Sequence, residues 1–419
     1  MSHKRKYLAF SLLMLAALPA QAYAEAGGDA ESHSEMKKFI SEGKAYIDAR
    51  YRFEYVDQDG VANTAKASTL RTRLGFKSGL VHGFGMKVEV EDVSEIGSDA
   101  YNNTLNGKTD RPVVADPDGT EVNEAYLSYE GVENTTIHAG REAIKLDNVR
   151  FVGDVGWRQN NQTYDNAHIV NTSVPDLKLM YGFIWNVNRI FGDDSPVGDL
   201  DTETHLVNVK YTGIPAAAIT AYAYLLDIED VPGLSSSTYG VRANGSSEMN
   251  ESMKLLYDGE YAYQEDYADN PTSYSAQYWR AELGAEMNGL TIRGGYESLG
   301  SDDGVAAVST PLATLHKWNG WADKFLATPA NGLNDAYAGV KYSMAGISDS
   351  LQKFSVEAIY HYFSSDEQST KYGEEWDFNL LTKVCEHVNL GVKYARYDAA
   401  NFATDTEKII FTLQTGFSQ

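Results

Sequence analysis

Residues 44–56 read KAYIDARYRFEYV, a stretch in which apolar and charged residues alternate almost without a break. The apolar set is Ile47, Ala49, Tyr51, Phe53 and Tyr55, and the charged set between them is Asp48, Arg50, Arg52 and Glu54. Successive side chains of a β-strand point to opposite faces. The stretch therefore predicts a long strand with one apolar face and one charged face.

The same alternation recurs along the chain. We count 18 segments, at about 44–56, 65–78, 83–92, 121–131, 133–140, 163–173, 176–188, 202–212, 215–227, 235–244, 253–265, 273–287, 289–299, 333–343, 350–363, 372–384, 387–397 and 406–417. Most are longer than the strands of soluble proteins and fit a tilted strand that crosses a membrane. The connections alternate between short turns and long loops, with residues 245–252 as a moderately long exception among the turns.

Short turns on one side and long loops on the other are typical of an outer-membrane barrel. An open sheet in hydrocarbon would leave unpaired backbone groups at its edges, so the sheet has to close. The predicted fold class is all-β: a transmembrane antiparallel β-barrel of about 18 strands (16–18), with short periplasmic turns and long extracellular loops. One barrel domain is expected over residues 44–417.

The N-terminus has the sequence pattern of an export signal. Lys4, Arg5 and Lys6 precede an apolar run from Leu8 to Ala20, and small residues follow at 22–24, which is the pattern of a secretory signal peptide. We assign residues 1–24 to that peptide and residues 25–43 to a periplasmic lead-in. The predicted location is the outer membrane of a Gram-negative cell, with membrane lipid and the barrel-assembly machinery as partners.

Composition excludes several other classes of protein. The 419 residues include 35 Lys and Arg against 59 Asp and Glu, for a net charge of −24, which argues against a nucleic-acid binder. Cys385 is the single cysteine, so disulfide frameworks and Cys-rich metal sites are ruled out. No apolar run near 18 residues follows the N-terminus, which excludes a helical membrane protein. No cofactor is predicted.

The polar faces of the predicted strands carry many basic residues. These are Arg50, Arg52, Arg71, Arg73, Lys77, Lys87, Arg280, Arg293, Lys341 and Lys393. Five of them stand on the first two segments, where clustered positive charge would concentrate anions, and Arg suits carboxylates and phosphates. The alternative is that these residues pair with the acidic residues of the same wall and only brace it.

Two stretches resemble a known family. Residues 140–153 read GREAIKLDNVRFVG and are followed by Trp157, Arg158 and Asp165, and residues 314–326 read TLHKWNGWADKFL. Both are similar to motifs of the alginate-export family of outer-membrane barrels. The resemblance implies an 18-stranded monomer that passes an anionic uronate polysaccharide through an Arg-lined constriction. It places Arg141 at the rim of that constriction, Arg150 on an inward loop, and a carboxylate at Asp165.

The loop at residues 141–162 also carries Arg158, and its glycines Gly153 and Gly156 allow tight turns. Such a loop can fold inward and narrow the lumen. The other interpretation is that Arg141 and Arg150 pair with Asp147 and Asp165 and pin the loop.

The predicted function is an outer-membrane channel that passes anionic or sugar-like polar solutes, including an anionic polysaccharide. The predicted constriction residues are Arg50, Arg52, Arg71, Arg73, Arg141, Arg150, Arg158, Asp165, Arg280 and Arg293. An outer-membrane lipid hydrolase is an alternative, but no Ser can be paired with the outward-facing His205 to make a nucleophile and base. A structural or adhesin barrel is another. His316 and Asp323 lie seven residues apart without an evident third ligand, so the sequence supports a metal site only weakly.

Overall fold

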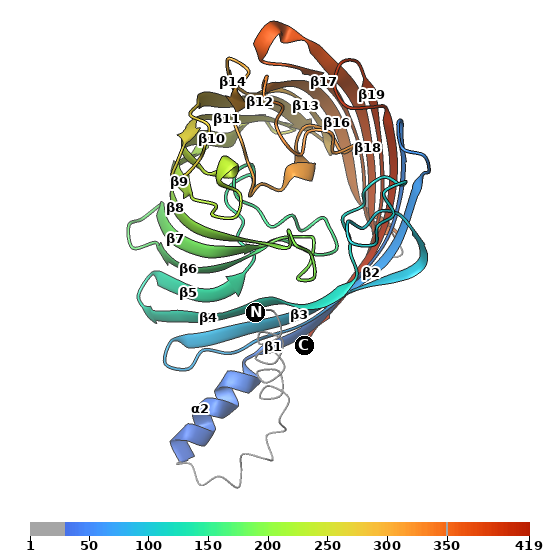
Figure 1. The fold of residues 1–419 in the computed structure, drawn as a ribbon. Coiled ribbons are helices and arrows are strands. Elements are labelled where there is room, and N and C mark those ends of the chain that lie inside the picture. Colours follow the sequence, from blue (N-terminus) through green and yellow to red (C-terminus); the bar gives the residue numbers. More distant parts are fainter. Residues whose placement is uncertain (1–29, 349–350) are drawn as a thin grey trace.

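The computed structural model describes residues 30–348 and 351–419, and the predicted signal peptide lies outside this range. Eighteen antiparallel strands form one sheet that closes on itself, because β1 pairs with both β2 and β20. The first nine strands are β1 (Lys44–Gln58), β2 (Ala65–Lys77), β3 (Phe84–Ala100), β4 (Gly119–Val132), β5 (Thr135–Glu142), β6 (Thr163–Asn171), β7 (Leu177–Asn188), β8 (Asp199–Ile214) and β9 (Ala217–Leu226). The other nine are β10 (Ser236–Asn250), β11 (Met253–Asp266), β12 (Ser275–Met287), β13 (Leu290–Leu299), β16 (Leu333–Ser348), β17 (Leu351–Ser364), β18 (Lys371–Cys385), β19 (Val388–Ala399) and β20 (Thr406–Ser418). The predicted fold class and the count of 18 strands are confirmed (Figure 1).

The remaining elements lie outside this sheet. Helix α2 (Ala30–Ser41) precedes β1 and meets the turn between β2 and β3, where the Gly79 N–H donates to the Phe39 carbonyl (2.9 Å). A small hairpin, β14 (Ser301–Asp302) and β15 (Ala306–Ala307), and three 3₁₀ turns, η1 (Pro232–Leu234), η2 (Leu315–Lys317) and η3 (Glu367–Ser369), belong to loops. No helix among the described residues is long and apolar enough to cross a membrane.

Turns and loops alternate as the sequence predicts, and one exception disappears. The 245–252 segment was expected to be a longer turn, but β10 continues to Asn250 and pairs there with Met253 of β11. Its Gly and Ser residues interrupt the apolar alternation but not the backbone pairing. The sequence pattern therefore predicted a β10 strand that is too short. Strands β3 and β4 likewise extend into the predicted loop at 93–120.

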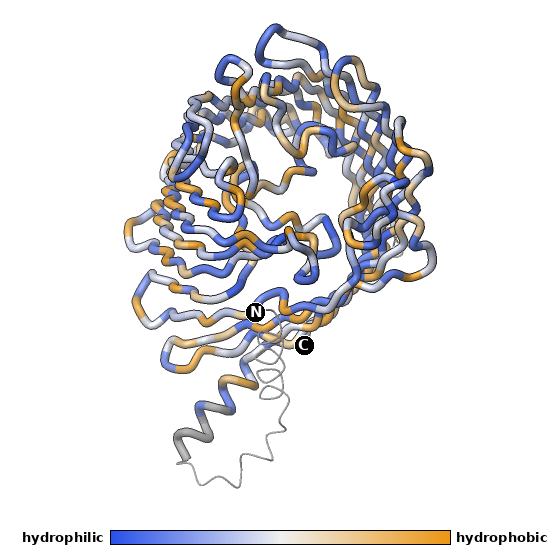
Figure 2. The backbone as a smooth tube through the Cα atoms, viewed as in Figure 1, coloured by the Kyte–Doolittle hydropathy of each residue, from blue (hydrophilic) through white to orange (hydrophobic). Residues whose placement is uncertain are grey.

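The two faces of the wall have opposite chemistry. Leu127 and Leu283 are each 63% exposed on the outside, whereas Arg71 and Glu89 are buried on the inside. A soluble protein buries its apolar face, so this inversion is the signature of a barrel surrounded by lipid. Hydrophobic and hydrophilic positions alternate along the strands (Figure 2). The barrel is therefore a protein of the Gram-negative outer membrane, as the sequence predicts.

Two long connections fold into the lumen (Figure 1). We call residues 143–162 the β5–β6 loop and residues 300–332 the β13–β16 loop. Their apolar residues Ile144, Phe151, Leu312 and Phe325 are buried and join the core inside the barrel. The space enclosed by the wall is thus partly filled, and these loops define the candidate site.

Candidate functional site

The two inward loops contact each other inside the barrel. The Gly153 N–H of the β5–β6 loop donates to the Leu312 carbonyl of the β13–β16 loop (2.8 Å), and Lys317 Nζ donates to the Asn148 carbonyl (2.9 Å). The two stretches that resemble alginate-export motifs therefore meet, although the contacting residues Val155 and Thr314 are 159 positions apart in the sequence. We call this region of contact inside the barrel the candidate constriction.

Arg150 lies at the centre of this contact. Its Nε stands 3.0 Å from Glu297 Oε1 on β13, and Nη2 donates to Asn319 Oδ1 (3.2 Å). The guanidinium also lies over the rings of Tyr278 and Trp318, at 5.9 and 5.5 Å from their centroids. The side chain is only 1% exposed. Arg150 is on an inward loop as predicted, but it holds the two loops to the wall and does not face a solute.

Arg50 and Arg52 of β1 hold the same loop from the opposite wall. Arg50 donates to Gln159 Oε1 (3.0 Å), to the Gly156 carbonyl (2.9 Å) and to the Arg158 carbonyl. Arg52 donates to the Trp157 carbonyl. A planar guanidinium with five donors suits several carbonyl oxygens at once. These two arginines therefore act as anchors for the β5–β6 loop.

Arg71 and Arg73 of β2 are also engaged. Arg71 pairs with Asp48, and Arg73 pairs with Glu91 while donating to Asn161 of the β5–β6 loop. Each positive charge has a carboxylate partner, so the bracing interpretation holds for this pair of residues. The proposed concentration of free positive charge on the first two strands is largely cancelled by these contacts.

Arg158 belongs to a buried charge network. Its Nη1 lies 3.0 Å from Glu54 Oε2 and 3.5 Å from Asp116 Oδ2, and its guanidinium lies over the ring of Trp157 (4.1 Å). Burial alone would raise the pKa of Asp116, but the positive charges of Arg158 and Arg52 lower it overall. Asp116 is therefore ionised when it fixes the β5–β6 loop to the loop between β3 and β4.

Arg141 and Asp165 stand opposite each other on β5 and β6. Two hydrogen bonds join them, at 2.7 Å from Nε and 3.2 Å from Nη2. The pinning interpretation thus describes Arg141, whereas Arg150 takes Glu297 as its partner. Asp147, the other expected partner, instead accepts a hydrogen bond from Asn208 (2.7 Å).

Arg280 and Arg293 differ in how far they face the open lumen. Arg280 lies 2.9 Å from both Asp258 and Glu282 and its side chain is 6% exposed. Arg293 lies 3.0 Å from Glu357, but its side chain is 35% exposed. Of the predicted constriction arginines, Arg293 therefore has the most exposed side chain.

Lys317 was missed by the sequence analysis and is an exposed cation on the β13–β16 loop. It is exposed, its Nζ lies 5.0 Å from the Trp318 ring, and it forms no ion pair with the described residues. Burial, and then the positive charges of Arg242 and Arg280, lower the pKa of Lys317. The Lys317-Trp318 pair in the second motif could have pointed to this residue. Strand alternation, however, gives no information on whether a loop folds into the lumen.

His316, next to Lys317, anchors the same loop on its buried side. His316 Nδ1 donates to Asp323 Oδ1 (2.8 Å), and Lys393 Nζ donates to His316 Nε2 (3.0 Å). Lys408 Nζ lies 2.6 Å from Asp323 Oδ2. Burial lowers the pKa of His316 to about 3, and a proton on Nε2 would face the Lys393 ammonium. The ring is therefore neutral, and Trp157 stacks on it at 3.5 Å.

A cavity of about 540 Å³ opens on the loop side of the constriction. Its lining combines apolar side chains with basic ones, among them Val113, Phe191, Leu326, Arg111, Arg189 and Lys324. Burial lowers the pKa of Lys324 to about 8, so the side chain remains mostly charged at neutral pH. Such a lining suits a small molecule that has both an apolar part and a negative charge.

On the outer face, His205 Nδ1 lies 2.9 Å from the Tyr181 hydroxyl. The ring also contacts Phe183, which is another outward residue. Within the described residues no serine hydrogen bonds to this histidine, so the geometry gives the lipid-hydrolase alternative no nucleophile.

The closed, lipid-facing wall and the loops inside the lumen define an outer-membrane β-barrel. No protein-family model matches the sequence, and no curated protein matches it. The fold is similar to crystal structures of Acinetobacter baumannii OccAB2 (16% identity, TM-score 0.71, 91% of this chain and 99% of that chain) and Pseudomonas aeruginosa OpdK with vanillate (13%, 0.71, 91% and 100%). It is equally similar to P. aeruginosa OccK9, also called OpdG (13%, 0.71, 91% and 100%). At these identities the likeness establishes the 18-strand barrel fold.

Proposed function

We propose that this barrel is a channel for small organic anions, taken up into the mixed apolar and basic cavity and passed beside Lys317 and Arg293. The observation that carries the proposal is the constriction itself. Two loops fixed to the wall occupy part of the lumen, and Lys317 and Arg293 present accessible positive charge there, whereas the exposed carboxylate of Asp147 accepts hydrogen bonds from Asn208 and Thr220. A narrow passage with an exposed cation favours anions over cations of similar size.

The structural neighbours support a solute of this kind. One of them is the crystal structure of OpdK with vanillate, which is a small aromatic carboxylate. Here the cavity offers Phe191 and Leu326 to an apolar ring and Arg111 and Lys324 to a carboxylate. The proposed substrate class is therefore small carboxylates with an apolar or aromatic body.

An anionic polysaccharide is the second candidate, and the two motif stretches favour it. Both stretches lie in the constriction, where that resemblance would place them. A polymer, however, needs an open path, and here the same stretches are joined to each other and to the wall by buried contacts such as Arg150 with Glu297. Passage of a chain would require these contacts to open, so the small-solute proposal is preferred.

Planar-bilayer recording of the refolded protein tests the proposal. We expect ion current through single channels and, in a salt gradient, a reversal potential that indicates anion preference. Addition of vanillate should reduce the current in a concentration-dependent way, and a uronate oligosaccharide should block it less. Absence of current would refute the channel, whereas cation preference would refute only the proposed solute class. Stronger block by the oligosaccharide would favour the polysaccharide.

A further inference from the structure

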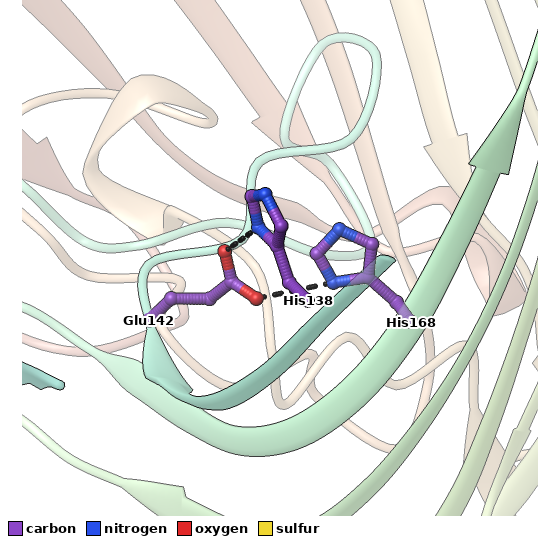
Figure 3. Close-up of side chains that lie close together, drawn as sticks. All are labelled: His138, Glu142 and His168. Carbon is purple, nitrogen blue, oxygen red and sulfur yellow. Dashed lines mark hydrogen bonds and ion pairs between the residues drawn. The ribbon is translucent and has the colours of Figure 1, made fainter. Parts of the chain in front are cut away.

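Three potential metal ligands meet on the lumen side of the wall, on strands β5 and β6. His138 and Glu142 belong to β5 and His168 to β6, and the two histidines are direct cross-strand partners. Their neighbours Ile137 and Ile169 are exposed on the lipid side, so both rings face the lumen side of the wall. Figure 3 shows the carboxylate of Glu142 directed toward both rings.

The potential ligand atoms already lie close to one another. Glu142 Oε2 lies 2.9 Å from His138 Nδ1, and Glu142 Oε1 lies 3.1 Å from His168 Nδ1. One ligand atom from each residue lies within 4.8 Å of both others, and no other group of this kind occurs in the part of the chain that the structure describes. Neighbouring ligand atoms of a tetrahedral zinc ion stand about 3.3–3.5 Å apart, given bonds of roughly 2.0–2.2 Å.

We propose that His138, Glu142 and His168 bind a divalent transition-metal ion of the zinc type. Each ring would bind through Nδ1, and the carboxylate would supply an oxygen. Two histidines and one glutamate form a known zinc ligand set, with the fourth position left to water or another oxygen. The rings now carry hydrogen on Nδ1 to reach the carboxylate, so binding moves that hydrogen to Nε2, or releases a proton from a charged ring.

The surroundings hold these groups in place. Asn166 is fully buried, and its Nδ2 donates to Glu142 Oε1 (3.2 Å) while its Oδ1 lies 3.0 Å from His168 Nδ1. Tyr126 stacks on the ring of His138 at 4.7 Å. The Asn166 bond to Glu142 can remain beside a bound ion and orient the carboxylate, whereas an ion on His168 Nδ1 replaces the contact with Asn166 Oδ1.

Glu142 is the last residue of β5 and is followed at once by the β5–β6 loop. A bound ion would add positive charge to the lumen wall where the constriction begins. We therefore expect zinc to increase anion preference of the channel. This conductance consequence rests on the proposed function, whereas binding of the ion does not.

Titration calorimetry of the full-length barrel in detergent with ZnCl₂ is the first test. We expect one saturable site per chain. His168→Gln should weaken binding more than about 100-fold, beyond the roughly 10–100-fold lost when only a supporting hydrogen bond is removed. Glu142→Gln should do the same while retaining a hydrogen-bonding side chain.

His205→Gln is the matched control, because His205 lies on the outer face with Tyr181. It should bind zinc like the unaltered protein. Each variant is first checked for the heat-sensitive gel mobility of a closed barrel, and Asn166→Ala, which leaves all three ligands, provides a second readout with an expected loss of about tenfold. The proposal is overturned if the unaltered protein shows no saturable site, or if His168→Gln and Glu142→Gln bind as tightly as it does. Binding without any ion current would refute the channel and leave the metal site standing.

Discussion

The two sides of the constriction use positive charge in different ways. On the β1 and β2 side, Arg50 and Arg71 are buried; Arg50 donates to loop carbonyls and Arg71 pairs with Asp48. On the β13 side, Arg293 is partly exposed and Lys317 has no ion-pair partner among the described residues. A dense group of arginines in the sequence therefore does not by itself predict a surface that selects anions.

The difference has a simple physical cause. A guanidinium buried in a low-dielectric site is stable only when its donors are satisfied, so the crowded arginines recruit loop carbonyls and carboxylates. The exposed side chain of Lys317 stays in contact with water, so its charge needs no carboxylate partner. The arginines on the β1 and β2 side therefore hold the loops in place, and the cations on the β13 side remain available to interact with the solute.

The largest expected effect comes from breaking the central anchor. Arg150→Met leaves Glu297 buried without its ion-pair partner, and removal of one member of a buried pair costs about 3–5 kcal/mol. We expect the two inward loops to separate from the wall and the single-channel conductance to rise. Hydrogen exchange of the amides of the β5–β6 loop measures the loss of docking free energy.

Arg396→Ala is the matched control for that variant. Arg396 pairs with Asp398 at 3.0 Å, but both side chains are exposed, and such surface pairs contribute at most about 1 kcal/mol. Loop exchange and conductance should remain unchanged. Equal effects of the two substitutions would show that burial of Arg150 does not hold the constriction.

Acid should weaken the opposite anchor of the β13–β16 loop. Burial lowers the pKa of His316 to about 3, whereas an exposed histidine titrates near 6.5. Between about pH 3 and pH 6.5, His316 is protonated when the loop is undocked but neutral when it is docked. Docking is therefore strongest above about pH 6.5 and weakens as the pH falls below that value. The expected loss is about 2 kcal/mol between pH 6.5 and pH 5.

Hydrogen exchange of the loop amides, corrected for the intrinsic rate at each pH, measures this slope. His316→Gln should remove it over the same range, because glutamine does not titrate. The pKa of Asp323 is lowered as well, so its contribution is lost only at still lower pH. A slope that survives in His316→Gln would assign the effect to another group.

Arg50 should have a smaller effect than Arg150 although it makes more hydrogen bonds. Its bonded partners are neutral oxygens, and Arg71 stands directly opposite it on β2. Arg50→Met thus leaves no buried charge unpaired and relieves a repulsion between like charges. We expect a loss of about 1–2 kcal/mol in loop docking, detected as faster exchange near Gln159. A loss as large as that of Arg150→Met would contradict this ranking.

The barrel could be predicted from the sequence because strand alternation is a local signal. The spacing of residues such as Ile47 and Arg50 alone predicts which face of the strand each one occupies. The sheet must close into a barrel because lipid offers no water to unpaired backbone groups. All 18 strands were found in this way. Their ends were less accurate where glycine and serine dilute the pattern, as at residues 245–250.

The constriction could be predicted only in part, because its contacts are long-range. The motif stretches lie on the two loops that fold into the lumen, and Arg141 pairs with Asp165 as one interpretation expected. The sequence could not show that Arg150 selects Glu297, nor that Lys317 remains accessible, because both depend on how two distant loops pack. The cross-strand meeting of His138 and His168 likewise depends on register, which alternation does not fix.

The smallest expected effect is on selectivity and concerns Lys317. Lys317→Gln removes an exposed charge but retains a donor for the Asn148 carbonyl, so the loops should stay docked. One charge beside a wet passage contributes on the order of 1 kcal/mol, and we expect the anion-to-cation permeability ratio to fall about two- to fivefold. Reversal potentials in a salt gradient measure this change, while the single-channel conductance in symmetric high salt should change little because salt screens the charge.

Lys371→Gln serves as the control for this substitution. Lys371 lies at the outer loop end of β18 and pairs with Glu374 at 3.1 Å on the exposed surface. Its removal changes the net charge by the same amount at a place that the solute does not have to pass. If both substitutions shift the reversal potential equally, overall charge governs selectivity and the division between anchoring and solute-facing cations is wrong. A shift confined to Lys317→Gln would locate selectivity on the sparsely charged side of the constriction.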